Sequence, residues 1–341
     1  MNILIVKLSA IGDVIHTLPS LAALRGLYPD AHITWVVEEA AAGLVKDHPY
    51  LDEVLVSRRK KWNKDFRGGR FRQPLGEIKY FIRTLRQRNY DLVIDFHGLF
   101  KSSIIIYLSR GKRKLGYDSW QELSGLFLNE KIPEDMNKHA VDRYLDFIRY
   151  LGGKPDRAQF VLPSGKKTEE KAQSLLRKYN LEDKKFIAVN PVALWETKLW
   201  SDEKFAGLAD LIIDKLQMKV VFTGNEKESL EKITSLMNKG SVNLGSQTSL
   251  SELAFIYKKA RLVISTDSGP MHLAAAVGTP VIALFGPTDP ARTGPYGLDH
   301  QIIRADMECS PCFLKKCPTK RCMANISREQ VFNAVKKIIK E

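Results

Sequence analysis

The stretch Ser265-Thr-Asp-Ser-Gly-Pro-Met-His-Leu-Ala-Ala-Ala276 decides the fold, because it lies between two apolar runs. The first run is Leu262-Val-Ile264 and the second is Val281-Ile-Ala-Leu-Phe285. This order predicts a strand, a tight turn, a helix and a further strand. Pro270 suits the first turn of that helix, since the N–H group that proline lacks would have no intrahelical partner there. The free amides and the helix dipole at such a turn favour an anionic ligand such as a phosphate.

The amino-terminal segment repeats this construction. Asn2-Ile-Leu-Ile-Val6 is predicted as a buried strand, and the turn that follows it ends at Asp13. The next apolar residues recur at the spacing of a helix: Val14, Ile15, Leu18, Leu21 and Leu24. Ligands of parallel α/β sheets bind beyond the carboxyl ends of the strands. Two such turns, far apart in the sequence, predict two α/β domains with parallel sheets that face a central cleft.

The rest of the chain alternates between strand and helix patterns, which is typical of parallel sheets. Further strands are expected at 33–37 and 91–96 in the first domain, and at 185–189 and 219–223 in the second. The expected organisation is a first domain over 1–160, a linker over 161–184, a second domain over 185–325 and a terminal helix within 326–341.

Length and composition agree with a globular protein of two domains. The chain has 341 residues, of which 44% are hydrophobic. No apolar run approaches the roughly 20 residues that span a bilayer. The amino terminus has a strand pattern instead of the charged and apolar regions of a signal peptide. We therefore expect a cytoplasmic protein.

Positive charge is concentrated in one segment. The formal net charge is +14, and residues 58–88 contain twelve Lys and Arg against Asp65 and Glu77. Residues 58–72 include Gly68-Gly69 and no clear period, so we expect a basic loop, followed by a helix around 78–85. Aromatic residues among the cations fit an anionic glycolipid or lipid surface, and they also fit single-stranded nucleic acid. A solvated loop that binds nothing is the plainest alternative.

Several motifs follow one another along the chain: Val6-Lys-Leu-Ser-Ala-Ile-Gly-Asp13, Trp35-Val-Val-Glu-Glu39, Asp95-Phe-His-Gly-Leu-Phe-Lys-Ser102, His139-Ala-Val-Asp-Arg143, Lys198-Leu-Trp200, Gly224-Asn-Glu-Lys-Glu228, the Asp267 turn and Phe285-Gly-Pro-Thr-Asp-Pro290. Together and in this order they resemble glycosyltransferase family 9, the bacterial ADP-heptose:lipopolysaccharide heptosyltransferases, and most closely its heptosyltransferase I type. The resemblance implies the GT-B fold, with two Rossmann-like domains and a terminal helix that crosses back to the first. It also implies inverting, metal-independent transfer of heptose from ADP-heptose to Kdo of lipid A, in the synthesis of the lipopolysaccharide inner core.

The resemblance assigns the chemistry of the first domain to a few residues. Inverting transfer requires a base that takes the proton of the acceptor hydroxyl, and Asp13 matches that acid. Capping of its own helix is the alternative for Asp13. The acceptor side of the cleft would further include Lys7 and Ser9, the histidines His97 and His139, and the basic residues Arg58, Arg59, Lys60, Lys61 and Lys64. Structural roles remain open for both histidines.

The second domain would bind the donor. Negative charge grows on the departing ADP, so fixed donors there lower the barrier, and the amides of Ser268 and Gly269 suit this role. Lys198 matches a family lysine at the phosphates, and Asp267 and His272 match positions at the sugar nucleotide. Glu228 matches a position near the ribose. Each of these residues has a structural alternative. These are a surface lysine for Lys198, a helix cap for Asp267, a core histidine for His272 and a solvated glutamate for Glu228. The chain has no Asp-x-Asp motif for a divalent metal.

All four cysteines lie in one short segment, as Cys309, Cys312, Cys317 and Cys322. Such a group can form a structural zinc or iron–sulfur site, two disulfides or free thiols. A cytosolic location disfavours stable disulfides. We expect no cofactor for catalysis.

The partners implied are the ADP-heptose donor and Kdo-lipid A at the inner leaflet, with the enzyme peripheral to the cytoplasmic face of the membrane. No nucleic acid and no obligate protein partner are expected. Within the family, the alternative is a heptosyltransferase II-like enzyme or one with another donor or acceptor. Outside it, the alternatives are a sugar-nucleotide epimerase of the same fold, a nucleic-acid-binding protein, suggested by the charge alone, and a non-catalytic lipopolysaccharide-binding protein.

Overall fold

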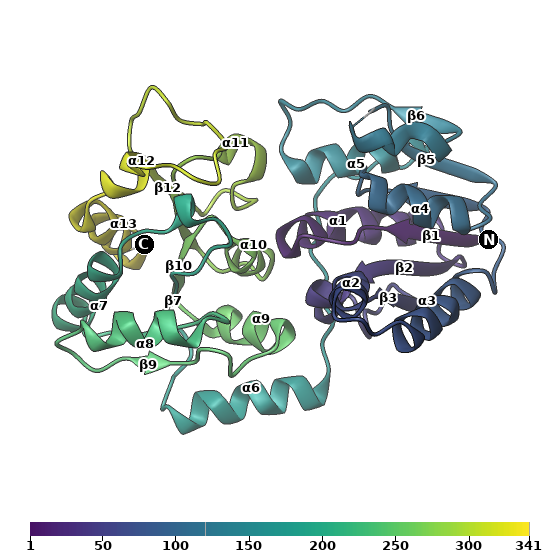
Figure 1. Ribbon diagram of the computed structural model, residues 1–341. Coiled ribbons are helices and arrows are strands. Elements are labelled where there is room, and N and C mark those ends of the chain that lie inside the picture. The colour runs from purple at the N-terminus through teal and green to yellow at the C-terminus, as the bar shows by residue number, and fades with distance from the viewer. Residues whose placement is uncertain (120, 341) are drawn as a thin grey trace. The chain divides into compact units, whose positions relative to one another are not determined.

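The computed structural model describes residues 1–119 and 121–340 of the chain. It divides into two compact units, Met1–Pro163 and Ser164–Glu341, and each unit is built on its own sheet (Figure 1). The boundary falls inside the segment expected to be a linker. The prediction of two α/β domains with parallel sheets is confirmed, because every strand pair in both sheets is parallel.

Unit 1 contains a six-stranded sheet of order β3-β2-β1-β4-β5-β6. Its strands are β1 (Asn2–Val6), β2 (His32–Glu38), β3 (Glu53–Ser57), β4 (Leu92–Asp95), β5 (Arg113–Tyr117) and β6 (Glu130–Ile132). The central strand β1 pairs with β2 on one side and with β4 on the other. Residues 3–6 are fully buried, as expected for a parallel strand that is covered on both faces.

Helices follow the strands of unit 1 in alternation. They are α1 (Ile11–Leu27), η1 (Glu39–Leu44), α2 (Arg59–Arg67), α3 (Arg72–Leu85), α4 (Phe100–Leu108), η2 (Gln121–Phe127) and α5 (Ala140–Tyr150). Helix α1 packs against α5, although almost the whole unit separates them in sequence. This packing brings residues of α5 next to the turn between β1 and α1, where the Asp13 motif lies.

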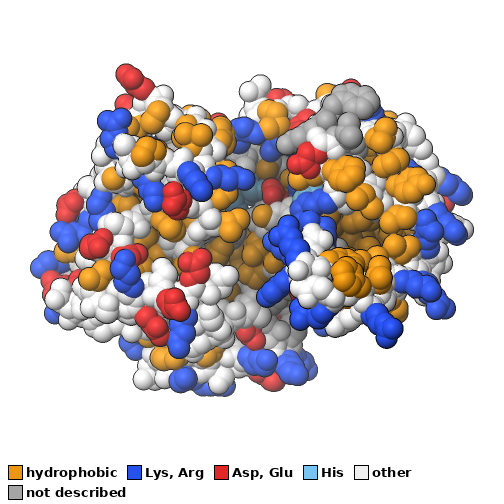
Figure 2. All heavy atoms as spheres, viewed as in Figure 1, with side chains coloured by type: hydrophobic (Ala, Val, Ile, Leu, Met, Phe, Trp, Pro, Cys, Tyr) orange, Lys and Arg blue, Asp and Glu red, His pale blue; other side chains and the backbone are white. Residues whose placement is uncertain are grey.

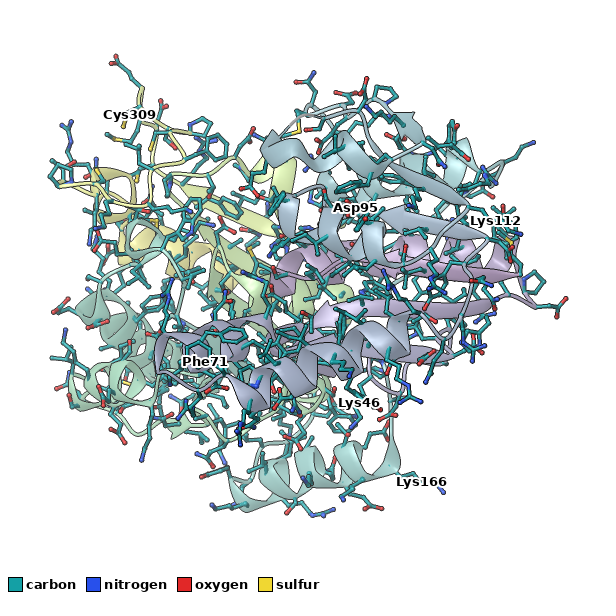
Figure 3. The ribbon with its side chains drawn as sticks, turned by 45° about the vertical axis from the view of Figure 1, so that its right-hand side comes forward. Lys46, Phe71, Asp95, Lys112, Lys166 and Cys309 are labelled. Carbon is teal, nitrogen blue, oxygen red and sulfur yellow. The ribbon has the colours of Figure 1, made fainter. Side chains whose placement is uncertain are left out.

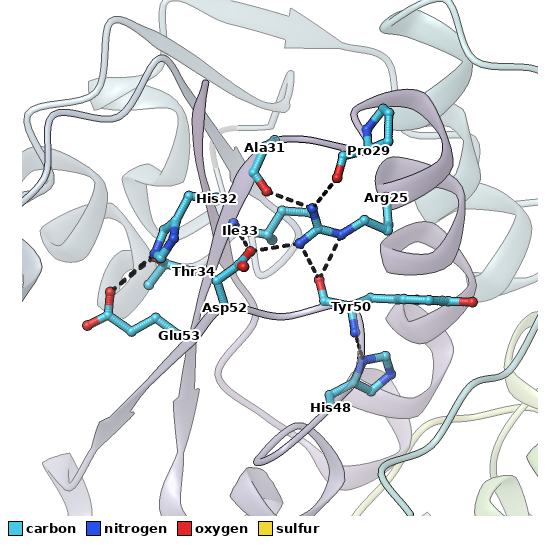
Figure 4. A network of polar contacts seen from close by, with 10 residues as sticks. All are labelled: Arg25, Pro29, Ala31, His32, Ile33, Thr34, His48, Tyr50, Asp52 and Glu53. Atoms are coloured by element: carbon cyan, nitrogen blue, oxygen red, sulfur yellow. Dashed lines mark hydrogen bonds and ion pairs between the residues drawn. The ribbon is translucent and has the colours of Figure 1, made fainter.

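The carboxyl end of α1 is held by one arginine (Figure 4). The guanidinium of Arg25 donates to the carbonyls of Pro29 at 2.9 Å, Ala31 at 2.6 Å and Tyr50 at 3.0 Å, and it pairs with Asp52 at 2.7 Å. Asp52 also accepts the amide of Ile33 at 2.8 Å. Arg25 therefore ties the helix to the start of β2 and to the turn before β3.

Unit 2 contains the second six-stranded sheet, of order β12-β11-β10-β7-β8-β9. Its strands are β7 (Phe186–Asn190), β8 (Lys219–Phe222), β9 (Val242–Asn243), β10 (Leu262–Thr266), β11 (Val281–Phe285) and β12 (Gln301–Arg304). Its helices are α6 (Lys166–Lys178), η3 (Glu196–Lys198), α7 (Asp202–Leu216), α8 (Lys227–Ser235), α9 (Leu250–Lys259), α10 (Gly269–Ala276), α11 (Pro290–Thr293), α12 (Arg321–Ala324) and α13 (Arg328–Lys340).

Two segments differ from the expected domain organisation. The expected linker, 161–184, contains helix α6, which packs on α9 of unit 2 through a buried stripe that includes Ala172 and Leu176. The terminal helix α13 packs on α7, β11 and β12, and Val331, Ala334, Val335 and Ile338 join the core of unit 2. That α13 crosses back to the first domain stays a prediction.

The basic segment 58–72 is not the loop that its composition predicted, because residues 59–67 form helix α2. Trp62 and Asp65 are its buried side. The indole of Trp62 donates to Glu77 on α3 at 2.8 Å, and Asp65 forms an ion pair with Arg70. Two buried anchors among many cations are enough to fix the helix, and Gly68 and Gly69 end it.

Candidate active site

Asp13 lies in the first turn of α1, directly beyond the carboxyl end of β1. Its carboxylate accepts the amide of Ala10 at 3.0 Å, and its charge acts on the buried Tyr144 of α5. The side chain is half-buried. Asp13 thus caps its helix, which was the alternative for this residue, and keeps part of its carboxylate toward solvent. To act as a base, Asp13 needs only this exposed part of its carboxylate to contact a hydroxyl group.

Lys7 is buried beside this carboxylate. Its amine donates to the carbonyl of Phe96 at 2.8 Å and to the hydroxyl of Tyr144 at 2.5 Å. Burial lowers the pKa of Lys7, while the charges of Asp13 and Asp95 oppose that change. A buried amine with nearby carboxylates supplies positive potential at the end of β1 without being exposed itself.

The end of β4 is fixed by Asp95, labelled in Figure 3. One carboxylate oxygen accepts the amides of His97 at 2.9 Å and Gly98 at 3.1 Å, and the other accepts the hydroxyl of Ser102 at 2.9 Å. Burial raises the pKa of Asp95 to about 6, against these hydrogen bonds. Burial, with the charge of Lys7, also lowers the pKa of His97 to about 2, so its imidazole is neutral. Asp95 therefore shapes the turn that carries His97.

Glu38, at the end of β2, forms ion pairs with several cations at the carboxyl edge of the sheet. Its buried carboxylate pairs with Arg59 at 3.1 Å, Lys101 at 3.5 Å and Lys60 at 3.9 Å. Lys101 also donates to the hydroxyl of Ser9 at 2.8 Å. Sequence reasoning quoted Glu38 within a motif but gave it no role. An acid at the end of an otherwise buried strand was the available signal.

The remaining residues predicted for the acceptor side are placed differently. Lys61 pairs with Glu77 of α3 at 2.7 Å, Arg58 pairs with Glu39 at 3.5 Å, and Lys64 is exposed near the end of α2. His139 is the N-cap of α5, where its ring accepts the amide of Val141 at 3.2 Å. His139 therefore caps α5, its ring lies 5.2 Å from that of His16, and a contact of His139 with the acceptor stays a prediction.

In unit 2, Asp267 and Lys198 form a buried ion pair with an N–O distance of 2.6 Å. Thr288, which follows β11, donates its hydroxyl to the same carboxylate oxygen at 2.5 Å. The ammonium of Lys198 also lies 4.5 Å from the ring centre of Trp195. The carboxyl ends of β10 and β11 and the short helix η3 are joined at this point. Sequence reasoning quoted Thr288 only as part of a motif.

Ser268 and Gly269 begin α10 as predicted, with Ser268 as the N-cap and proline in the first turn. The hydroxyl of Ser268 accepts from the amide side chain of Asn190 at 3.1 Å and donates to the carbonyl of Thr266 at 3.2 Å. His272 is buried one turn further along. Glu228 lies exposed in the first turn of α8.

A glycine keeps the neighbouring loop close to β7. Gly224 has φ of +148°, and a Cβ there would lie 2.7 Å from Cγ2 of Val192. Only glycine allows this approach without a shift. This contact fixes the position of the loop before α8 against the segment that follows β7. Glu228 lies in the first turn of the helix that this loop enters.

The four cysteines are free thiols on the loop between β12 and α12, where Figure 3 labels Cys309. Within residues 1–119 and 121–340, no group of three or more His, Cys, Asp and Glu is placed to hold a metal ion. The described part of the chain also contains no helix that is long and apolar enough to cross a membrane.

Comparisons with known proteins extend over nearly the whole chain. The family model of glycosyltransferase family 9 (heptosyltransferase) matches residues 78–323. A lipopolysaccharide heptosyltransferase 1 of Escherichia coli is 31% identical over 90% of this chain and 95% of its own length. A protein of the same name from Pseudomonas aeruginosa is 30% identical over 97% of this chain and 92% of its own. The solved structure of E. coli heptosyltransferase WaaC with ADP-2-deoxy-2-fluoro heptose has a TM-score of 0.79 and 26% identity, and the match covers 99% of both chains.

Proposed function

The chain belongs to glycosyltransferase family 9 and has the two-domain GT-B fold of its heptosyltransferases, and from this premise we propose its reaction. It transfers L-glycero-D-manno-heptose from ADP-heptose to Kdo of lipid A, with inversion at the anomeric carbon and without a metal ion. The ligand of the similar E. coli structure supports the donor, and the names of the two relatives support a lipopolysaccharide acceptor.

The observation that carries the proposal is the setting of Asp13. One oxygen is held by the Ala10 amide, and the side chain remains half-exposed at the carboxyl end of β1. A carboxylate that is held in this way can accept the proton of a sugar hydroxyl as that hydroxyl attacks. We therefore assign the base to Asp13.

The donor is proposed to bind unit 2. Ser268 is the N-cap of α10, and the free amides of the first helical turn suit the diphosphate of ADP. Lys198 would compensate the charge that develops on the leaving group, which needs no bound metal for this purpose. Asp267 would orient heptose hydroxyls, while Thr288 and Lys198 hold its carboxylate. Glu228 and His272 remain proposed contacts of the nucleotide and the sugar.

The acceptor is proposed to reach unit 1 from a membrane surface. The surface around α3 and α4 exposes Phe71, Leu75, Tyr80, Phe100, Ile104 and Tyr107. Figure 2 shows hydrophobic side chains gathered there and bordered by Lys and Arg. Exposed aromatic side chains within a basic rim are typical of proteins that bind the interface of an anionic bilayer. We propose peripheral attachment to the cytoplasmic face of the membrane, with the cations of α2 turned to the acceptor phosphates.

The test is ADP release on mixing the protein with ADP-L-glycero-β-D-manno-heptose and Kdo-lipid A, with and without EDTA. We expect release that requires the acceptor, persists in EDTA and falls at least about 100-fold in Asp13→Ala, the range for loss of a general base. Calorimetric ADP binding should be unchanged in that variant. The NMR coupling of the product's anomeric proton reports inversion.

Two results would contradict the proposal. Absence of release from the wild type would reject this pair of substrates, and release with a heptosylated acceptor instead would favour a heptosyltransferase II-like activity. Full activity of Asp13→Ala would reject the base while leaving the substrates in place.

A further inference from the structure

We propose that Glu38 is a positioning residue for acceptor binding: its buried carboxylate holds Arg59 and Lys101 beside the turn between β1 and α1, where the two cations bind an oxyanion of the acceptor. The inference rests on the proposed function and deepens it. It gives a role to a buried acid at the end of β2, and it adds Lys101 of α4 to the acceptor side of unit 1.

The cluster lies where three neighbouring strands, β2, β1 and β4, end at the same edge of the sheet. Glu38 is the last residue of β2, and its amide donates to the carbonyl of Leu8, just beyond β1, at 2.9 Å. Lys101 lies in the first turn of α4, which follows β4, and its ammonium donates to the Ser9 hydroxyl at 2.8 Å and to the Glu38 carboxylate at 3.5 Å. Ser9 lies in the turn that ends at Asp13, so these cations are placed near the proposed base.

Strand register brings Arg59 to the same carboxylate. Glu38 pairs with Ser57, the last residue of β3, and α2 begins two residues later at Arg59. The guanidinium donates to Oε1 of Glu38 through Nε at 3.3 Å and through Nη2 at 3.1 Å. The side chains of Arg59 and Lys101 are 40% and 21% exposed. One buried oxygen therefore holds two partly exposed cations, and both have further N–H donors to offer to a ligand.

The other oxygen of Glu38 is not satisfied in the way that a purely structural acid would be. Oε2 is buried without a hydrogen-bond partner among the described residues, and the ammonium of Lys60 approaches it only to 3.9 Å. Asp95, at the end of β4, is also buried, but both of its oxygens accept hydrogen bonds. A buried oxygen without a partner lowers stability. The effect of Glu38 on its cations explains its position better than the stability of unit 1 does.

Such an acid prepares the cations for a ligand. Like charges that are brought together repel one another, and long side chains lose rotamer freedom when a ligand immobilises them. The carboxylate between Arg59 and Lys101 offsets this repulsion and orients both side chains before the ligand binds. With Lys60, three cations surround one acid, so the cluster keeps an excess of positive charge. Its ligand is an oxyanion, for which the acceptor offers the carboxylate of Kdo and the phosphates of lipid A.

The experiment uses Glu38→Gln, because positioning and simple electrostatics predict opposite results for it. Removal of a negative charge raises the positive potential of the cluster, so charge alone would tighten the binding of an anionic acceptor. Loss of positioning weakens it instead. We expect the KM for Kdo-lipid A to rise about 3- to 10-fold, as when a rotamer-rich side chain must be immobilised on binding. The kcat and the KM for ADP-heptose should stay near their wild-type values.

The matched control is Glu53→Gln. Glu53 is the first residue of β3, at the opposite end of the sheet from Glu38, and it pairs with Arg88 at 3.5 Å. The substitution makes the same change in net charge and removes a carboxylate from an ion pair, but away from the turn that carries Ser9. It should leave the KM for Kdo-lipid A unchanged.

A double variant tests whether Glu38 acts through Lys101. Lys101→Met should raise the KM for Kdo-lipid A, because one of the two cations is lost. Adding Glu38→Gln to it should raise the KM by a smaller factor than in the wild type, because only Arg59 then remains to be positioned.

Direct binding identifies the anion and does not depend on turnover. Free Kdo has a carboxylate and no phosphate, whereas glycerol phosphate has a phosphate and no carboxylate. Each is titrated by NMR into the wild type and into Glu38→Gln at one ionic strength, because salt screens such contacts. The anion whose Kd rises in the variant is the group that the cluster binds.

An unchanged or lower KM for Kdo-lipid A in Glu38→Gln would overturn the inference. So would an equal rise in Glu53→Gln, a parallel rise in the KM for ADP-heptose, or independent, multiplicative effects in the double variant. Absence of ADP release from the wild type is a different outcome, because it rejects the proposed reaction. In that case, equal affinities of the wild type and Glu38→Gln for both anions, or no binding of either anion, would overturn the role of Glu38 as well.

Discussion

Thr288→Val tests the environment of Asp267 in the proposed donor site. The Thr288 hydroxyl donates to the Asp267 carboxylate at 2.5 Å, and both side chains are about 95% buried, since each is 5% exposed. Valine has nearly the shape of threonine but places a methyl group against the carboxylate. Lys198 remains at 2.6 Å, so the charge keeps one partner and loses the other.

The expected cost follows from the type of bond. A hydrogen bond to a charged group contributes about 1.5–3 kcal/mol, whereas a neutral one contributes about 0.5–1.5 kcal/mol. For a unit of this size, each kcal/mol lowers Tm by roughly 2–4 °C. We therefore expect the melting transition of unit 2 to fall by about 3–12 °C, and the KM for ADP-heptose to rise, because Asp267 is less well oriented.

The control is Thr279→Val in the same unit. Thr279 is 1% exposed, and its hydroxyl donates to the carbonyl of Tyr257 at 2.7 Å, which is a neutral bond. The assay is differential scanning calorimetry of both variants with and without ADP, followed by initial rates. Equal Tm changes in the two variants, with an unchanged KM in Thr288→Val, would refute the reasoning that this carboxylate depends on Thr288.

Three further predictions concern unit 1. Burial raises the pKa of Asp95 to about 6, so protonation of Asp95 stabilises the folded state at low pH, and this contribution is lost as pH rises from about 4 through 6. The decline of Tm over this pH range should disappear in Asp95→Asn, and a curve identical to that of the wild type would contradict the prediction. Arg25→Met should destabilise unit 1 by about 1–3 kcal/mol, more than removal of the exposed Arg113–Glu130 pair, in denaturant titrations. Leu75→Ser with Tyr80→Ser should weaken sedimentation with anionic vesicles severalfold, while Leu298→Ser, fully exposed in unit 2, should not; equal binding by all three proteins would reject the proposed membrane surface.

The sequence predicts the central strands well because they are buried on both faces. Residues 3–6 and 281–285 are apolar throughout, and the segments that follow them carry Asp13 and Thr288. The outer strands carry no such signal. β5 reads Arg-Lys-Leu-Gly-Tyr, and its first two residues are charged and not buried. The sequence does not predict helix α2 for a related reason, since seven of its nine residues are not buried and give no apolar pattern.

Contacts between distant segments explain what the sequence leaves out of the site. Lys7 and Tyr144 are 137 positions apart, and only the packing of α5 on α1 joins them. Nothing in the local sequence of α5 distinguishes Tyr144 from a core tyrosine. Asp267 and Thr288 are closer, at 21 positions, but they meet because β10 and β11 are neighbours. Helix packing decides the first pair and strand order decides the second, and no local sequence pattern fixes either of them.

The order of the strands also has a consequence for how the chain is made. In unit 1 the first strand synthesised, β1, becomes a central one: β2 can pair with it early, but its other edge waits for β4, after α3. Until then β1 has an unpaired edge that can associate wrongly. Every strand of unit 1 precedes Pro163, so its sheet can close while the ribosome is still supplying unit 2. Folding from the amino terminus would protect this apolar strand soonest, and slow translation between β2 and β4 would lengthen its exposure.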